Sequence, residues 1–415
     1  MIIRELIVTP IAFRDPPLLN ASGVHEPFAL RTIVQLEVDG GIVAVGEGSG
    51  GSSVARRLNS LRSALVGMSV FDLTSIERTV RAVLGDHEPH LSEIERTRIF
   101  SIIDVACHDA QGKVVGLPVV DLLGGRARAS VPYSAYLFYK WGSHPSADGA
   151  ATPDDEWGAA LDPQGIVRQA QYMVDQYGFE SFKLKGGVLP PESEIAAVRA
   201  LAEAFPGKPL RLDPNGVWSV ETSIRAAREL AGTLEYLEDP SLGMDIMARI
   251  GAETGVPLAT NMCVVEFDQI AEAVEKRAVQ VILSDHHLWG GLRHTRELSA
   301  ICATFGLGMS MHSNSHLGIS LAAMTHVAAA SPWLTHACDT HYPWNRADDI
   351  ITPGAIDIIG GAVEVPTGPG LGVVIDEAAL ARQHDVFLSC GITERDDTGY
   401  MRRFDAHFDP TTPRF

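Results

Sequence analysis

The sequence predicts an α/β fold in which a (β/α)8-type barrel is joined to an α+β capping domain at its N-terminal end. Two observations predict the barrel. Short apolar runs alternate with segments whose apolar residues recur at helical spacing. Six successive runs end in a polar residue, at intervals of 23 to 28 positions, which is the length of one strand plus one helix. A third observation separates the capping domain, because the first part of the chain has the pattern of strands followed by helices without this period.

Residues 1–128 are expected to form the capping domain. Residues 2–13 and 32–47 have the pattern of antiparallel strands, and the second stretch contains an Asp-Gly-Gly hairpin signal. Between them lies a glycine-containing loop that carries Asn20 and His25. Residues 54–126 have helical periodicity, so a sheet followed by helices is predicted.

Residues 129–365 are expected to form the barrel, with residues 131–139 as its first strand and residues 335–344 as its eighth. The polar loop 140–163, rich in Gly, Pro, Asp and Ser, is long enough to be functional, and we expect it to cover the site. Residues 366–415 contain no further strand–helix repeat. We therefore expect this tail to pack back on the capping domain.

Composition and charge limit the kinds of molecule that the protein can bind and indicate where it works. The 415 residues carry a net charge of −19, which excludes binding of nucleic acid or an anionic membrane through charge. The five cysteines include no Cys-x-x-Cys pair and are typical of reduced core residues. No apolar run reaches transmembrane length and the N-terminus lacks the apolar core of a signal peptide, so a cytoplasmic location is expected.

A pair of lysines lies in the apolar run that precedes Gly186. If this run is a strand, Lys183 and Lys185 emerge on the same side, while Phe182 and Leu184 face the other way. A neighbouring ammonium group and burial both lower a lysine pKa, which would make one of the pair a usable base near neutral pH. The alternative is a solvated pair on an edge strand.

The runs that follow the lysines also end in polar residues. The carboxyl-terminal ends of barrel strands face the active site, so we expect these side chains to converge there. For the two carboxylates the alternative is capping of the next helix. The polar residues are Asp213, Glu238, Asn261, Asp285 and His312.

The ordered motifs resemble those of the enolase superfamily, of the mandelate racemase/muconate lactonizing enzyme type, and are most similar to the glucarate dehydratase group. The resemblance covers nearly the whole chain, and its specificity lies in the joint order of the motifs. They are Lys183-x-Lys185, Asp213-x-Asn215, Glu238-Asp239-Pro240, Ala-Thr-Asn ending at Asn261, Asp285 and His312-Ser313-Asn314. Further matching stretches are Asn20 to His25, FKLKGGVL, LDPNGVW, ATNM, SHLGISLAAMTHVAAA, DTH and Arg395-Asp396-Asp397.

The resemblance implies removal of a proton next to a carboxylate, then loss of water to give a keto-deoxy sugar diacid. Lys185 would be the base, with Lys183 holding the substrate carboxylate and lowering the pKa of Lys185. His312, oriented by Asp285, would act on the opposite face and protonate the departing β-hydroxyl group. A Lys or His base combined with Mg²⁺ is the known arrangement of the superfamily.

The resemblance also implies a magnesium site. Hard oxygen ligands suit Mg²⁺, and Asp213, Glu238 and Asn261 would supply them from three successive strands. Most of the superfamily has an acidic residue at the position of Asn261, whereas the glucarate dehydratase group has asparagine. The connection from Glu238 to Asn261 looks short for that group, which argues against a ligand from residues 240–250.

The substrate is expected to be a small acid sugar. A diacid needs cations at both ends, and Arg395 or Arg31 could meet the distal carboxylate, although Arg395 could equally belong to a surface ion pair. His90 lies where a smaller hydroxyl residue is expected, which would change the pocket. By resemblance, the substrate contacts are Asn20, His25, Tyr136, Lys183, Ser313, Asn314, His341 and Arg395.

Two other functions remain open. A racemase or epimerase of a 2-hydroxy acid would also use Lys185 and the His312–Asp285 dyad on opposite faces, but Asn261 argues against it. A barrel that only binds or assembles would not need this full set of bases and ligands. A homo-oligomer is expected, with no number fixed by the sequence.

Overall fold

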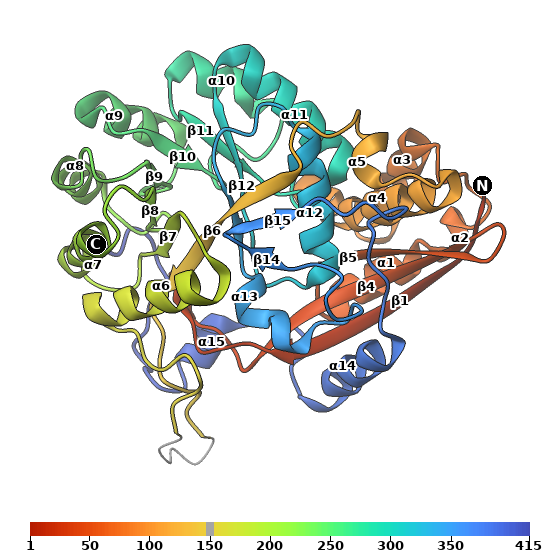
Figure 1. Cartoon of the computed structure of the whole chain (residues 1–415), viewed down its shortest axis with the longest axis horizontal. Coiled ribbons are helices and arrows are strands. Elements are labelled where there is room, and N and C mark those ends of the chain that lie inside the picture. Colours follow the sequence, from red (N-terminus) through yellow and green to blue (C-terminus); the bar gives the residue numbers. More distant parts are fainter. Residues whose placement is uncertain (147–152) are drawn as a thin grey trace.

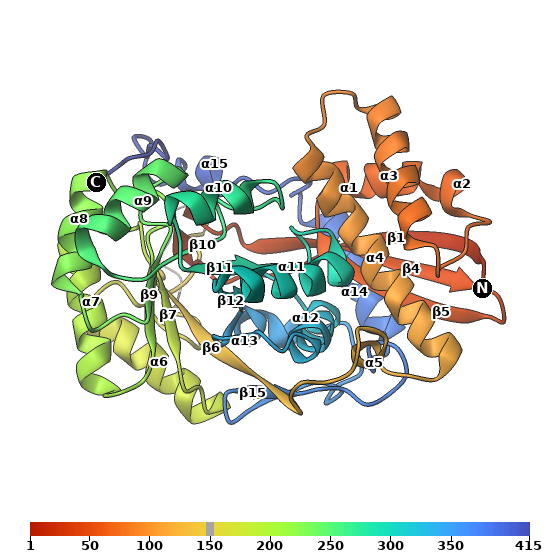
Figure 2. The ribbon, with the colours of Figure 1, turned by 90° about the horizontal axis from the view of Figure 1, so that it is seen from above.

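The computed structural model of the protein describes residues 1–146 and 153–415. A sheet with helices packed on one side forms the cap, and a barrel of strands and helices lies beside it (Figures 1 and 2). The predicted fold class is confirmed. Both parts matter for the site, because segments of each line the same cavity.

The cap contains a three-stranded antiparallel sheet in the order β1-β4-β5. The helix α4 packs against β5, and Gly46 permits the close approach, since a Cβ there would lie 2.4 Å from the carbonyl oxygen of Ile102. A separate hairpin, β2–β3, follows β1. The strands are β1 (Ile3–Arg14), β2 (Leu19–Asn20), β3 (Gly23–Val24), β4 (Phe28–Val38) and β5 (Ile42–Ser49). The helices are α1 (Ser52–Ser60), α2 (Arg62–Leu65), α3 (Leu73–His87), α4 (Glu93–Val115) and α5 (Val119–Leu122).

Eight parallel strands form the barrel within the described residues, each paired with the next from β6 to β12, and β13 pairs with β6 to close it. The strands are β6 (Ser130–Phe138), β7 (Phe182–Lys185), β8 (Leu210–Asp213), β9 (Tyr236–Glu238), β10 (Leu258–Thr260), β11 (Val281–Ser284), β12 (Gly308–Met311) and β13 (Cys338–Thr340). A helix follows each strand: α6 (Pro163–Tyr177), α7 (Pro191–Ala204), α8 (Val220–Glu229), α9 (Met244–Thr254), α10 (Gln269–Lys276), α11 (Gly291–Phe305), α12 (Gly318–Ala330) and α13 (Tyr342–Asn345).

The barrel strands are buried on both faces, as parallel strands covered by helices must be. The register places Lys185 between Phe138 of β6 and Asp213 of β8. The helix α12 is buried along its whole length because it packs against α5, β5, β6 and α11, between cap and barrel. A largely apolar helix sequence suits that position.

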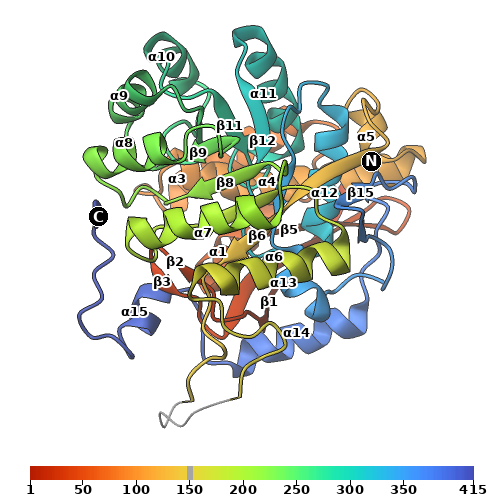
Figure 3. The ribbon, with the colours of Figure 1, turned by 60° about the vertical axis from the view of Figure 1, so that its left-hand side comes forward.

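The C-terminal segment returns to the cap. The 3-10 helix η1 (Arg346–Asp348) and the hairpin β14 (Ile358–Ile359)–β15 (Ala362–Glu364) come first, and β15 pairs with β6. Then α14 (Glu377–Ser389) packs on β1, and α15 (Asp397–Met401) lies beside β3 (Figure 3). The division of the chain at residues 128 and 365 stays a prediction.

The five cysteines are free thiols, and Cys107, Cys302 and Cys338 are buried. Among the described residues, no helix combines the length and the apolar character that crossing a membrane requires.

Candidate active site

The two lysines of β7 point into a buried cluster of carboxylates. Lys183 is fully buried, and its Nζ lies 2.7 Å from Glu238 Oε1, 2.8 Å from Asp339 Oδ2 and 3.3 Å from Asp213 Oδ2. Lys185 Nζ lies 2.7 Å from Asp213 Oδ2 and donates to the Asn215 side chain. Both ammonium groups therefore share Asp213, so the two lysines lie on the same side of the strand.

The expected lowering of the lysine pKa is wrong for this arrangement. Burial alone would lower the pKa of Lys185, but Asp213 and the other acidic groups around it together raise the pKa by more, and repulsion from Lys183 offsets only part of the rise. Burial also lowers the pKa of Lys183, and Asp339 and Glu238 reverse this strongly. The sequence placed the second ammonium group correctly but did not reveal how many carboxylates surround the pair.

The oxygen atoms at the ends of β8 and β9 fit a hard divalent cation. Glu238 Oε2 is buried and finds no hydrogen-bond partner among the described residues, so it is available as a ligand. Burial, and then repulsion from Asp213, raises the pKa of Glu238 well above its usual value. A cation between the two carboxylates would remove that repulsion.

Asn261, the third expected metal ligand, follows β10 and is half-buried. Its backbone N–H donates to Asp239 Oδ2 at 2.7 Å, and Thr260 Oγ1 donates to Asp239 Oδ1 at 2.5 Å. Asp239 has a positive φ of 35° and is fully buried. Asp239 thereby fixes the main chain that carries Asn261, a function that the sequence did not reveal.

His312 and Asp285 form a hydrogen-bonded pair at the ends of β12 and β11. His312 Nδ1 lies 3.2 Å from Asp285 Oδ2, and His287 Nδ1 lies 2.8 Å from Asp285 Oδ1. Burial would raise the pKa of Asp285, but His287 and His312 hold it well below its usual value. The ionised carboxylate therefore fixes the orientation of both imidazole rings.

A cavity of about 210 Å³ lies over this cluster. Lys185 and His312 both line it, whereas Lys183, Asp285, Asp213 and Glu238 are buried and do not. The structure does not bring Lys183 to the cavity wall, so the expected contact between Lys183 and a substrate carboxylate is not seen. Seven other predicted contact residues line the cavity: Asn20, His25, Tyr136, Ser313, Asn314, His341 and Arg395.

The two candidate arginines have different surroundings. Arg31 is buried and paired with Glu47 at 2.9 Å, and it does not line the cavity. Arg395 lines the cavity and also forms a forked ion pair with Asp397, with Nη2 to Oδ2 at 2.8 Å. Of the two, only Arg395 is placed to meet a carboxylate in this cavity.

One expectation about the pocket does not fit the structure, and one does. His90 is exposed in the turn between α3 and α4 and lies outside the cavity wall, so it does not shape the pocket. The connection from Glu238 to Asn261 contains α9, and none of residues 240–250 lines the cavity.

Sequence reasoning missed three groups that the fold brings to the site. Asp339, at the end of β13, contacts Lys183, and Asn215 contacts Lys185. Glu194 of α7 accepts hydrogen bonds from the backbone amides of residues 187, 188 and 189, at 3.0, 2.9 and 3.0 Å. Asp339 and Asn215 stood in strand-end motifs, which was the available signal, whereas nothing in the sequence marks Glu194.

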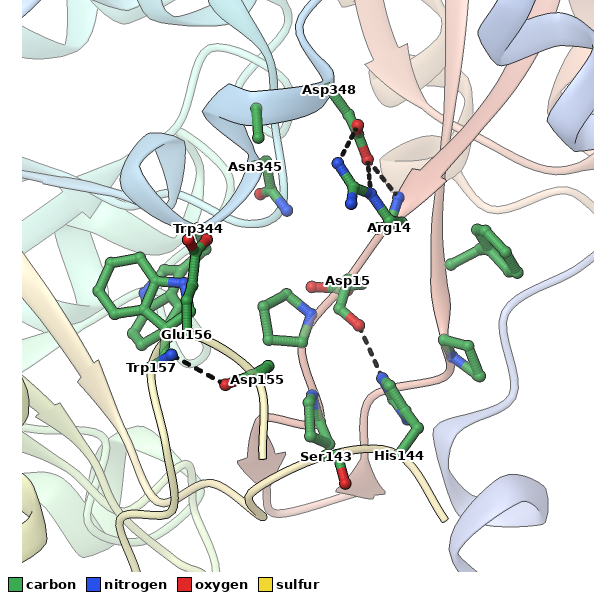
Figure 4. Close-up of a pocket in the computed structure, with 15 residues that line it drawn as sticks. Arg14, Asp15, Ser143, His144, Asp155, Glu156, Trp157, Trp344, Asn345 and Asp348 are labelled. Carbon is green, nitrogen blue, oxygen red and sulfur yellow. Dashed lines mark hydrogen bonds and ion pairs between the residues drawn. The ribbon is translucent and has the colours of Figure 1, made fainter. Parts of the chain in front are cut away.

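Figure 4 shows a second cavity, of about 350 Å³. Trp157 and Trp344 stand at one edge of it, and Arg14 pairs with Asp348 at another. Five described residues of loop 140–163 line this second cavity, and none of the described ones lines the first. The expected cover over the site is therefore not seen among the described residues; residues 147–152 lie outside the described part. Its remaining charged lining is acidic, which does not suit a diacid.

Known proteins share this architecture. Residues 4–124 match the mandelate racemase / muconate lactonizing enzyme N-terminal domain, and residues 165–379 match the enolase C-terminal domain-like family. The chain is 52% identical over 429 residues to a Streptomyces coelicolor protein named probable glucarate dehydratase, covering 100% of this chain and 99% of the relative.

Two solved structures agree over the full length. An enolase from Thermobispora bispora, complexed with magnesium and formate, is 53% identical with a TM-score of 0.96, and the match covers 100% of both chains. An enolase from Mycobacterium smegmatis, complexed with tartrate, is 56% identical with a TM-score of 0.95, covering 100% of this chain and 98% of that one.

Proposed function

Because the chain belongs to the enolase superfamily, we propose that it is a Mg²⁺-dependent acid-sugar dehydratase of the glucarate dehydratase type. The observation that carries the proposal is that a lysine and a carboxylate-oriented histidine line one cavity directly above a buried carboxylate cluster. The similarity to a probable glucarate dehydratase supports the choice of substrate class.

Lys185 Nζ takes the proton next to the substrate carboxylate. The electron pair left behind forms a C=C bond as the C–O bond to the β-hydroxyl group breaks. His312 gives its proton to that hydroxyl, which leaves as water, and the resulting enol becomes a keto acid. Asp285 keeps His312 oriented.

Asp213, Glu238 and Asn261 are proposed to hold the magnesium ion, with which a solved relative is complexed. Mg²⁺ held by these oxygens would supply positive charge that stabilises the charge developing on the substrate, and would weaken the hold of Asp213 on the proton of Lys185. Lys183 is proposed to balance the charge of Glu238 and Asp339 below the cavity, which replaces its expected contact with substrate.

The cavity walls supply the substrate contacts. Asn20 and His25 reach it from the cap, Tyr136, Ser313, Asn314 and His341 from the barrel, and Arg395 from the C-terminal segment. Arg395 is the proposed partner of the distal carboxylate, in exchange for part of its contact with Asp397.

A racemase or epimerase of a 2-hydroxy acid is the second candidate, because the same two side chains line the cavity and could move a proton between faces. The two functions differ in product, since only the dehydratase forms a keto acid. A homo-oligomeric state and a cytoplasmic location stay predictions.

The test is an assay of purified protein with Mg²⁺ on C4 to C6 mono- and diacid sugars, scoring keto-acid formation and deuterium uptake from solvent. We expect keto acid from glucarate, lost in Lys185→Ala and Asp213→Ala and retained in Lys208→Ala, which removes a lysine paired with Glu180 away from the cavity. Deuterium uptake without keto acid would favour the racemase, and neither signal with any acid would reject both.

A further inference from the structure

Arg414 joins three separate segments near the catalytic cavity. Its Nη2 donates to the carbonyl of Ala21 at 2.6 Å, and its Nη1 donates to the carbonyl of Gly187 at 3.3 Å. Its backbone N–H donates to the carbonyl of Val217 at 2.7 Å. The backbone oxygen of Phe415 accepts from the N–H of Ser219 at 2.5 Å, so the main chain here is fixed to the loop after β8.

Each of these three segments carries a residue of the cavity wall. Ala21 forms the turn of the hairpin β2–β3, between Asn20 and Ser22, which both line the cavity. The other two contacts fall two residues beyond Lys185 and two residues beyond Asn215. The loops after β7 and β8 also touch each other, since a Cβ on Gly187 would lie 2.2 Å from the carbonyl oxygen of Pro214.

The hairpin β2–β3 is short and depends on its neighbours for its position. It is held on one side by α15, where a Cβ on Gly23 would lie 2.7 Å from Met401 Cβ. Two-residue strands provide few internal hydrogen bonds, so such a hairpin opens easily unless tertiary contacts hold it. The Arg414 side chain contacts both this turn and the loop after β7.

We propose that Arg414 is a positioning residue that latches the hairpin β2–β3 onto the barrel loops carrying Lys185 and Asn215, and so completes the substrate cavity. The effect on turnover rests on the proposed function, whereas the effect on the hairpin does not. A substrate that touches Asn20 must bind the closed hairpin, so a weaker latch reduces apparent affinity by the fraction of molecules that are open. Once the substrate is bound, the hairpin is closed and the chemical step is unchanged.

The planar guanidinium group suits this position, because it donates in two directions at once to carbonyls on different segments. Arg414→Lys keeps the charge but can make only one of these contacts with good geometry. We therefore expect its effects to lie between those of the native chain and those of Arg414→Ala. Arg414 is only partly buried, so its loss leaves the cores of the cap and the barrel intact. Arg382, an exposed arginine of α14, provides a matched control for charge in the C-terminal segment.

The experiment compares Arg414→Ala, Arg414→Lys and Arg382→Ala with the native chain by amide hydrogen exchange, by steady-state kinetics on glucarate with Mg²⁺, and by titration with tartrate. In Arg414→Ala we expect exchange at residues 19–24 to be about tenfold faster, and KM and the Kd for tartrate to rise about tenfold, with kcat within about twofold. Arg414→Lys should give exchange rates, KM and Kd values between those of the native chain and of Arg414→Ala, and Arg382→Ala should match the native chain in all three.

Unchanged exchange at residues 19–24 in Arg414→Ala would overturn the proposal, as would faster exchange without a change in KM or in the Kd for tartrate. Faster exchange throughout the chain with a lower Tm would show a merely structural role and would also overturn it. If the native chain converts no acid sugar, the proposed function fails, while hydrogen exchange and the tartrate titration still decide on the latch.

Discussion

Lys183 of β7 and Asp339 of β13 lie on the two barrel strands that flank β6. Their side chains meet inside the barrel, where Lys183 Nζ lies 2.8 Å from Asp339 Oδ2. Both side chains are fully buried, and Arg211 Nη1 approaches the other oxygen of Asp339 at 3.5 Å. The aspartate thus balances positive charge from two strands below the cavity. Its removal would leave those cations buried without a full set of partners.

Asp339→Asn is therefore expected to destabilise the fold. A broken buried ion pair costs about 3 kcal/mol of unfolding free energy, because the remaining charge stays in a medium of low dielectric constant. The measurement is urea denaturation at pH 7. Asp348→Asn serves as the control, since it breaks an ion pair with the largely exposed Arg14 and should cost less than about 1 kcal/mol. Equal stability of Asp339→Asn and the native chain would contradict the expectation.

Magnesium is expected to stabilise the native chain but not the Glu238→Gln variant. A ligand at about 100 times its Kd adds about 2.7 kcal/mol to the stability of the protein that binds it. Replacing the carboxylate removes a charged ligand, so the rise in Tm with Mg²⁺ should disappear. Glu156→Gln, in the wall of the second cavity, should keep the full rise. A rise in both variants would place the ion elsewhere.

Lys185→Ala and His312→Asn should separate the two faces of the reaction. Loss of a general base or acid typically costs about 10²- to 10⁴-fold in rate, so both variants should lose keto-acid formation. His312→Asn should still exchange the α-proton with solvent deuterium, because Lys185 remains. The readout is proton NMR of the recovered substrate in D₂O. Exchange that persists in Lys185→Ala would assign the base to another residue.

Glu194 should make stability depend on pH. Burial raises the pKa of this carboxyl to about 7, from an ordinary value of 4.5, although three backbone N–H groups oppose the rise. The folded chain then binds more protons than the unfolded chain between these values. The contribution is fully present below pH 4.5 and is lost as the pH rises to about 7.

Urea denaturation between pH 4.5 and 8 tests this assignment. Glu194→Gln should remove a fall in stability across that window, whereas Glu192→Gln, an exposed position on the same helix, should leave it unchanged. Identical pH profiles of Glu194→Gln and the native chain would exclude Glu194 as the source.

The sequence alone predicts the barrel and the residues at its strand ends, because the spacing of apolar residues and the polar residue that ends each apolar run are local signals. It could not show the partners that only closure of the barrel creates. Asp339 meets Lys183 because β13 returns to β6, and this contact turns the lysine pKa upward. The prediction that His90 shapes the pocket was wrong for a similar reason, because resemblance in sequence does not show which turns face the cavity.

The cavity wall is assembled from separate parts of the chain. Lys185 and His312 stand on barrel strand ends, whereas Asn20 and Ser22 come from a cap hairpin and Arg395 from the C-terminal segment. We therefore expect that changes in the hairpin and the C-terminal segment alter which acid fits, while the proposed proton-transfer groups stay in place. For a protein engineer, randomising residues 20–25 and 395–397 offers a route to new substrates on an unaltered catalytic frame.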